Sequence, residues 1–304
     1  MRLSPVFAVL VTGLLAAAPS LIQAQSQPAA TESTSQASQA SPASAAPAKS
    51  GAAAEVKPLW EVGVFALTGA QQAYPGSALQ VHPRLALPFV IYRGPLLRAD
   101  EEGMGLHTKL APNVDIDLGL AAAFGSSASQ SEVRRGMANI GTLVEFGPRL
   151  RVALGDLSGH YRWRFSLPLR GVFDLNHRLA ARGISAEPEL GWSRHTAADN
   201  TYRASVAAVL GNRNLTDTFY GVSAADVTPS RAAYAARPGL VAWRLSSSAG
   251  LALSRDWTLI GYARWDSLSG AANRDSPLVE RSSGATFGVG VSWTALRSER
   301  RASE

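Results

Sequence analysis

Hydrophobic and polar side chains alternate with a period of two along most of the chain after Trp60. Between residues 113 and 120, for example, Ile116 and Leu118 alternate with Asp115 and Asp117. Successive side chains of a β-strand point to opposite faces, so this alternation predicts strands whose two faces meet different surroundings. Twelve runs fit the pattern: 60–70, 80–92, 104–110, 113–124, 139–154, 160–174, 184–194, 202–212, 216–222, 240–254, 257–266 and 284–294.

The length of these runs separates two all-β architectures. A water-soluble β-sandwich also alternates, but runs of about ten residues that begin or end with Trp, Tyr or Phe are typical of tilted membrane crossings. We therefore predict a closed antiparallel transmembrane β-barrel of about 12 strands, or about 10 without the two weakest runs, 104–110 and 216–222. Pro88, Pro148 and Pro168 lie inside runs and predict bulges or strand ends, because proline cannot donate a ladder hydrogen bond.

The N-terminal part of the chain lacks this alternation. Arg2, an apolar stretch up to Ala18 and small residues up to Ala24 predict a cleaved secretory signal peptide over residues 1–24. Residues 25–58 are almost wholly Ala, Ser, Gln, Pro and Thr, which predicts a disordered periplasmic leader. The barrel would then occupy residues 59–294, and residues 295–304 would form a polar tail.

The composition fits an exported barrel. Charged residues make up 17% of the 304 residues, which is low for a soluble protein, and the net charge of +6 comes mostly from arginine. No basic cluster is interleaved with aromatic residues, so we expect no nucleic-acid partner. The chain has no cysteine, which excludes disulfides, thiolate metal sites and cysteine nucleophiles. The expected location is the cell outer membrane, in contact with its lipid and lipopolysaccharide.

Charged residues fall on the face of the runs opposite the hydrophobic residues, where a barrel has its lumen. Because buried charges need partners, we predict an ion-pair network across the lumen. Its expected members are Asp115, Asp117, Glu145, Arg149, Arg151, Arg162, Arg164, Arg170, Glu187 and Glu189, with Arg203 and Arg244 on the same kind of face.

Candidate catalytic groups are few. Ser193 and His195 share one strand face with Asp199 nearby, but side chains two apart on a strand lie about 6–7 Å from each other, too far for an easy contact. We interpret them as residues at the barrel rim. We expect no catalytic residue, no cofactor and no metal site, and therefore no enzyme.

Seven short segments, taken in order, resemble one known family. They are Tyr74-Pro75-Gly76-Ser77, 87–94 (LPFVIYRG), 135–137 (RGM), 145–148 (EFGP), 219–222 (FYGV), 234–239 (YAARPG) and Asp275-Ser276-Pro277-Leu278-Val279. The set resembles the MipA/OmpV family, and the resemblance covers the chain from Trp60 to Trp293. Two features depart from the family pattern: the Ala/Ser-rich leader, and a final aromatic residue, Trp293, that lies eleven residues before the end.

The resemblance implies an outer-membrane barrel that acts as a scaffold for murein-processing enzymes, with a lytic transglycosylase and a murein synthase as partners. Two other roles of such barrels stay open, a narrow channel for small solutes and a surface adhesin. The turns at Tyr74–Ser77 and at Asp275–Pro277 have two readings as well. They shape loops, or they contact a partner or form a plug over the barrel mouth.

Overall fold

The computed structural model describes residues 58–93, 97–100, 103–123, 125–156, 161–196 and 198–300. The expected signal peptide and all but the last residue of the expected leader lie outside these residues. The described chain is mainly strand: β1 (Trp60–Gln72), β2 (Gln80–Val81), β3 (Arg84–Arg93), β4 (Leu97–Asp100), β5 (Gly103–Ala111), β6 (Val114–Ala123), β7 (Leu143–Asp156), β8 (Tyr161–Asp174), β9 (Ala180–Ala186), β10 (Glu189–His195), β11 (Thr201–Gly211), β12 (Gly239–Ala252), β13 (Trp257–Ser267) and β14 (Ser283–Arg297). One α-helix, α1 (Arg213–Tyr220), and short 3-10 turns lie in the connections.

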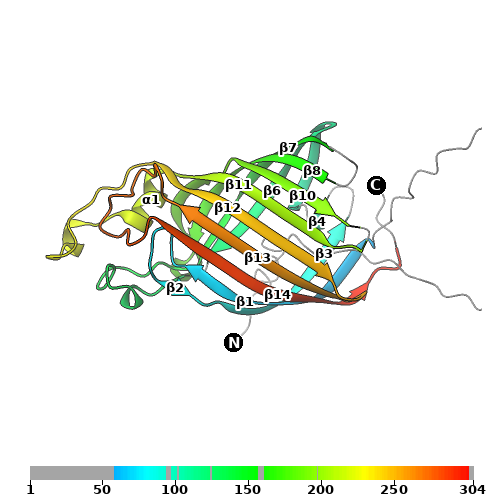
Figure 1. Ribbon diagram of the computed structural model, residues 1–304, viewed down its shortest axis with the longest axis horizontal. Helices are drawn as coiled ribbons and strands as arrows, with labels where there is room; N and C mark the ends of the chain where they lie inside the picture. The colour runs from blue at the N-terminus through cyan, green and yellow to red at the C-terminus, as the bar shows by residue number, and fades with distance from the viewer. Residues whose placement is uncertain are drawn as a thin grey trace, which may run out of the picture.

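The strands form one closed antiparallel barrel, as predicted. β1 pairs with β14 on one side and with β3 on the other, and β10 pairs with both β8 and β11, which completes the ring. β9 and β10 share the place between β8 and β11, so the described residues give the ring twelve strand positions. In Figure 1 the strands run obliquely, with α1 and the long connections at one end. No helix among the described residues is both long and apolar enough to cross a membrane.

The two faces of the wall differ sharply, and β14 shows why. Phe287, Val289 and Trp293 are exposed on the outer face. The inner face carries Gly288, Gly290 and Ser292 in alternation with them. An apolar exterior matches the lipid of a bilayer.

Exposed tryptophans mark both ends of the outer face. Trp257 and Trp293 are paired across β13 and β14 and stack with ring centroids 6.0 Å apart, near the end where β1 begins. Trp243 and Trp265 lie toward the α1 end of β12 and β13. Trp257 and Trp265 are eight residues apart on one strand, about 26 Å along it, which fits a tilted crossing of the apolar band between two aromatic girdles.

Several details of the strand prediction were wrong. Run 184–194 is divided between β9 and β10, and run 80–92 between β2 and β3. Residues 216–222 belong mostly to α1, which begins after Asn212, whose side chain accepts a hydrogen bond from Leu215 N. The four-residue strand β4 was missed because it is too short to show alternation. Pro88 and Pro148 mark neither bulges nor strand ends, since the register continues through both. Pro168 also lies inside β8, next to the break between β9 and β10.

Part of the lumen is apolar and tightly packed. Phe65, Leu67, Phe89, Ile91 and Ile260 form a buried cluster on the inner faces of β1, β3 and β13. β14 has room for it because its inner glycines carry no side chain: a Cβ on Gly290 would lie 2.7 Å from the Phe65 ring. The lumen therefore has an apolar cluster on the inner faces of β1, β3 and β13 as well as its charged residues.

Candidate functional site

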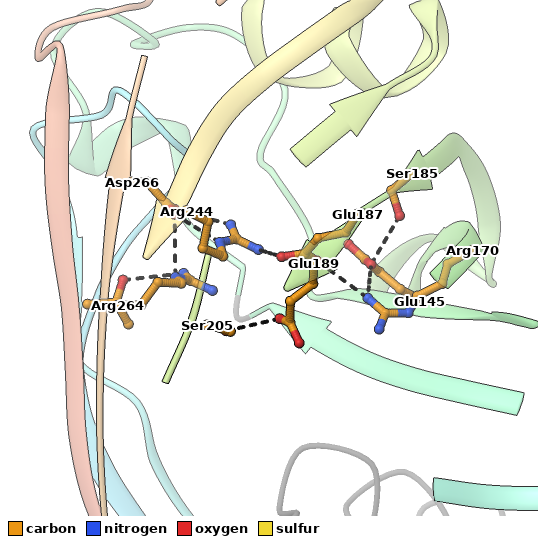
Figure 2. Close-up of polar contacts among 10 residues, drawn as sticks. Glu145, Arg170, Ser185, Glu187, Glu189, Ser205, Arg244, Arg264 and Asp266 are labelled. Atoms are coloured by element: carbon orange, nitrogen blue, oxygen red, sulfur yellow. Dashed lines mark hydrogen bonds and ion pairs between the residues drawn. The ribbon is translucent and has the colours of Figure 1, made fainter. Parts of the chain in front are cut away.

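A chain of alternating charges crosses the lumen just below the α1 end (Figure 2). Arg170 on β8 lies 3.3 Å from the Glu145 carboxylate and 3.7 Å from that of Glu187. Glu187 in turn accepts a hydrogen bond of 3.0 Å from Arg244 on β12. These contacts link the β7–β8 side of the wall to the β12 side.

Arg244 is the centre of this chain. Its Nε and Nη2 donate to the two oxygens of Asp266 at 2.8 and 3.1 Å, a bidentate pair, while Nη1 holds Glu187. β11 lies between Arg244 and the Glu187–Glu189 segment, and the residue it places there is Ala207. Because that side chain is small, the guanidinium can reach across β11.

A second group of ion pairs lies on the β6–β7 wall, further from the α1 end. Asp117 is only 2% exposed, and it is held at 2.8 Å by both Arg149 and Arg151. Asp115 shares the face of Asp117 and is opposite Arg151 in the register. One carboxylate thus serves two guanidinium groups.

The predicted network residues lie as follows. Asp117, Glu145, Arg149, Arg151, Arg170 and Glu187 are brought together in ion pairs. Glu189 accepts a hydrogen bond of 3.1 Å from Ser205, on the next strand. Arg162 and Arg164 are on the inner face of β8 but join neither group.

Two further sets of lumen charges were missed. Arg264 and Asp266 on β13 flank the outward Trp265, and their alternation with it was the signal that would have found them. Glu61 and Arg93 form an ion pair of 3.0 Å, almost fully buried, near the end where β1 begins. Single charges in otherwise apolar strands gave no such signal. His195, a candidate rim residue, has its Nδ1 3.1 Å from Thr201 Oγ1. No group of three or more His, Asp or Glu within the described residues is placed to hold a metal ion.

The α1 end of the barrel is filled by its own connections, which we call the loop cap: residues 73–79, 126–140, 212–238 and 268–281. Tyr74 Oη donates to Leu278 O at 2.7 Å, Tyr220 Oη donates to Pro75 O at 2.9 Å, and Ser276 Oγ donates to Tyr220 O at 2.7 Å. Three of the sequence segments that carry the family resemblance therefore meet in one place, although up to 204 residues separate them.

Local chemistry explains the turn residues of the cap. Gly76 has φ +92°, and a Cβ there would lie 2.8 Å from Leu268, so only glycine fits without strain. Its carbonyl accepts hydrogen bonds from both Glu280 N and Arg281 N. Ser77 and Ser276 are buried, whereas the Asp275 side chain is 72% exposed.

Two arginines tie the remaining loops into the cap. Arg134 lies 5.6 Å above the Tyr74 ring and donates to Phe219 O at 3.1 Å. Arg231 donates to Val133 O and Arg135 O at 2.7 and 3.1 Å. Burial raises the pKa of Tyr74 to about 12, so its hydroxyl stays protonated, and donates to Leu278 O, at neutral pH.

The cap seats on the inside of the barrel mouth. Leu143 and Val172, on the same inner faces as Glu145 and Arg170, belong to one buried cluster with Leu215 and Tyr220 of α1. The charge network lies one pair of strand residues further in. Cap and network together close this end of the lumen with side chains.

Comparison with known proteins gave one strong result. A family model described as MltA-interacting protein MipA matches residues 62–295. No curated protein gives a significant match. Among solved structures, the chain resembles a NanC porin (TM-score 0.36, 11% identity, 76% of this chain and 98% of that chain covered) and a bacterial polysaccharide outer membrane secretin (0.35, 11%, 80% and 99%). It also resembles a Pseudomonas aeruginosa FadL homologue (0.28, 10%, 77% and 89%).

These structural scores are too low to carry an argument of their own. The family match does carry an argument, because it covers nearly the whole barrel. It runs from the start of β1 to near the end of β14 and includes every connection that builds the loop cap. The chain belongs to the MipA family.

Proposed function

We propose that this outer-membrane barrel is a non-enzymatic scaffold that binds murein-processing enzymes at its periplasmic end, a lytic transglycosylase of the MltA type first among them. The observation that carries the proposal is the family match over the whole barrel, since the family is described by its interaction with MltA. A murein synthase that works with the transglycosylase is the second expected partner.

The orientation of the barrel follows from its connections. At the α1 end they are long and packed into the cap, whereas at the other end they are short, as at 112–113 and 253–256. Outer-membrane barrels have short periplasmic turns and longer extracellular loops. We therefore place the cap outside and the short turns in the periplasm, where murein enzymes work. The turns at Tyr74 and Asp275 then serve the cap, not the murein enzymes.

The filled mouth of the barrel favours a scaffold function and argues against a wide pore. Twelve strands enclose less space than the open sixteen-stranded porins do. In this barrel, Arg170, Arg244 and the cap occupy that space toward one end. A narrow solute channel remains the alternative. It is favoured by Arg162, an exposed arginine on the inner face of β8 near the end of the barrel with the short turns.

Co-purification tests the scaffold. The full-length barrel in detergent is mixed with a purified MltA-type transglycosylase, and we expect a stable complex on size exclusion. Arg255→Glu in a periplasmic short turn should weaken the complex, while Arg135→Glu in the cap, an equal change of charge, should not.

Two results would count against the scaffold. The first is the absence of a complex between the wild-type barrel and the transglycosylase. The second is reproducible solute-selective conductance in planar bilayers by a barrel that retains no envelope partner, which would favour the channel.

A further inference from the structure

We propose that the lumen half nearer the short turns holds a binding site for carboxylate groups, centred on Arg162 and Arg164. Both belong to β8, which begins at that end with Tyr161. They share the inner face with Arg170, and β8 pairs with β10 without a register shift along this stretch. Their guanidinium groups therefore point into the lumen, below the charge network.

The two arginines differ from the other lumen cations of β7, β8, β12 and β13. Arg149, Arg151, Arg170 and Arg244 each have a carboxylate within ion-pair distance. Neither Arg162 nor Arg164 has an ion pair or side-chain hydrogen bond with any side chain that the structure describes.

The space around them is open to solvent. Arg162 is exposed and Arg164 is half-buried, and Ala153, opposite Arg164 on β7, is exposed as well. On β10 the neighbours are Gly191 and Ser193, and Ser205 follows on β11. Small residues thus leave room next to Arg164, and hydroxyl groups add further donors. Arg203 on β11, opposite Ser193, adds another cation to the same face beside Arg162.

Two acidic residues on neighbouring inner faces, Asp117 and Glu189, are already engaged. Asp117 is shared by two arginines, and Glu189 accepts the Ser205 hydroxyl. Unpaired guanidinium groups favour planar anions, which they bind through two parallel hydrogen bonds. Arg162 and Arg164 are two residues apart on one face, about 6–7 Å, so they suit a ligand that carries at least two carboxylates.

The cap decides how this ligand reaches the site. The α1 end is filled, so the ligand enters from the short turns and leaves the same way. Such a ligand is either a free polycarboxylate or an acidic segment of a periplasmic protein. The chemistry is the same in both cases, and the probes below separate them.

Titration calorimetry on the full-length barrel in a neutral detergent provides the test. The probes are tetraglutamate for an acidic segment, citrate for a free polycarboxylate, inorganic phosphate for another anion, and tetralysine. We expect saturable binding of tetraglutamate, citrate or both, weakening with added salt, and none of tetralysine. Tighter binding of tetraglutamate identifies a protein segment, and tighter binding of citrate identifies a solute.

Matched variants place the site. Arg164→Gln alone and together with Arg162→Gln should weaken binding at least tenfold. Arg135→Gln with Arg274→Gln, which removes two exposed charges from the cap, should leave it unchanged. Heat-modifiable migration on a gel shows that each variant is folded, and the single Arg164→Gln variant suffices if the double one is not. Absence of saturable binding, equal binding by Arg164→Gln, or preference for phosphate over both carboxylates would overturn the proposal.

Discussion

Arg244 joins carboxylates that come from distant parts of the barrel wall. It holds Glu187 and Asp266 at once while its own side chain is 17% exposed. A buried ion pair is weak evidence for stability when both partners are replaced, because bringing charges out of water is costly. Removal of only the central charge has a larger effect, since it leaves two carboxylates buried without their main partner.

Arg244→Gln should therefore destabilise the barrel by about 3–5 kcal/mol. Urea unfolding in detergent, followed by tryptophan fluorescence, measures the change. Arg135→Gln in the cap should change stability by less than about 0.5 kcal/mol, because its salt bridge with Glu132 is exposed. Equal stability of Arg244→Gln and the wild type would mean that water replaces the network without loss.

At the scale of the strand, β14 stabilises the apolar part of the lumen because its inner glycines have no side chains. Its inner glycines let the Phe65 and Tyr262 rings lie against the backbone. Gly290→Val should cost about 1–3 kcal/mol, because added carbons must displace a packed ring. Gly261→Val on the outer face of β13, where a Cβ would meet nothing within 4 Å, is the control and should be nearly neutral in the same urea titration.

The face of a strand on which a new charge is placed also determines how much that charge destabilises the barrel. Leu167 is exposed on the outer face of β8, and Leu167→Arg should cost roughly 2–4 kcal/mol because it puts a charge in lipid. Ala153→Arg, on the inner face of β7, should cost much less because the lumen there is open to water. Folding yield into vesicles, read by heat-modifiable migration, compares the two, and the reverse order would mean that the faces are assigned wrongly.

The same alternation determines which strands, and which of their faces, could be predicted from the sequence. In β14 the contrast between Phe287–Trp293 and Gly288–Ser292 predicted both the strand and its faces. It failed for 216–222, a run with several β-branched and aromatic residues. There Thr216 and Tyr220 lie on one buried helix face, and Asn212 caps the first turn.

Ion-pair partners could not be predicted from alternation. It placed Glu187 and Arg244 in the lumen, but not 3.0 Å from each other, because 57 residues and one intervening strand separate them. The cap motifs were likewise visible only as separate turns. Their meeting depends on which strands close the ring, which local pattern does not encode.

At the scale of the whole molecule, the cap links stability to pH. Tyr74 titrates at about 12 in the folded barrel and near 10 when unfolded, because burial disfavours the phenolate. The folded state then holds the proton more tightly, so stability is fully present below pH 10 and falls as the pH rises from 10 to 12. The loss per group is about 1.4 kcal/mol for each pH unit in that window.

Limited proteolysis of the cap at pH 9 and pH 11.5 measures this loss. The wild type should be cut faster at the higher pH. Tyr74→Phe cannot ionise at this position, so it should show a smaller increase, although it loses the hydrogen bond to Leu278 O, worth about 1 kcal/mol, at both pH values. An unchanged increase in Tyr74→Phe would assign the effect to another group, such as Tyr220.

The cap also has a consequence for assembly. Tyr74 follows the first strand, Tyr220 ends α1, and Leu278 comes just before the last strand, so their hydrogen bonds join both ends and the middle of the barrel sequence. We expect the Tyr74–Leu278 bond to form only after β14 has paired with β1, because that pairing brings residues 74 and 278 together. A half-inserted chain would therefore leave its loops open to envelope proteases, whereas a finished barrel hides them. Formation of the cap should therefore coincide with the last step of insertion. The time at which the loops become resistant to protease during folding would then measure when the ring closes.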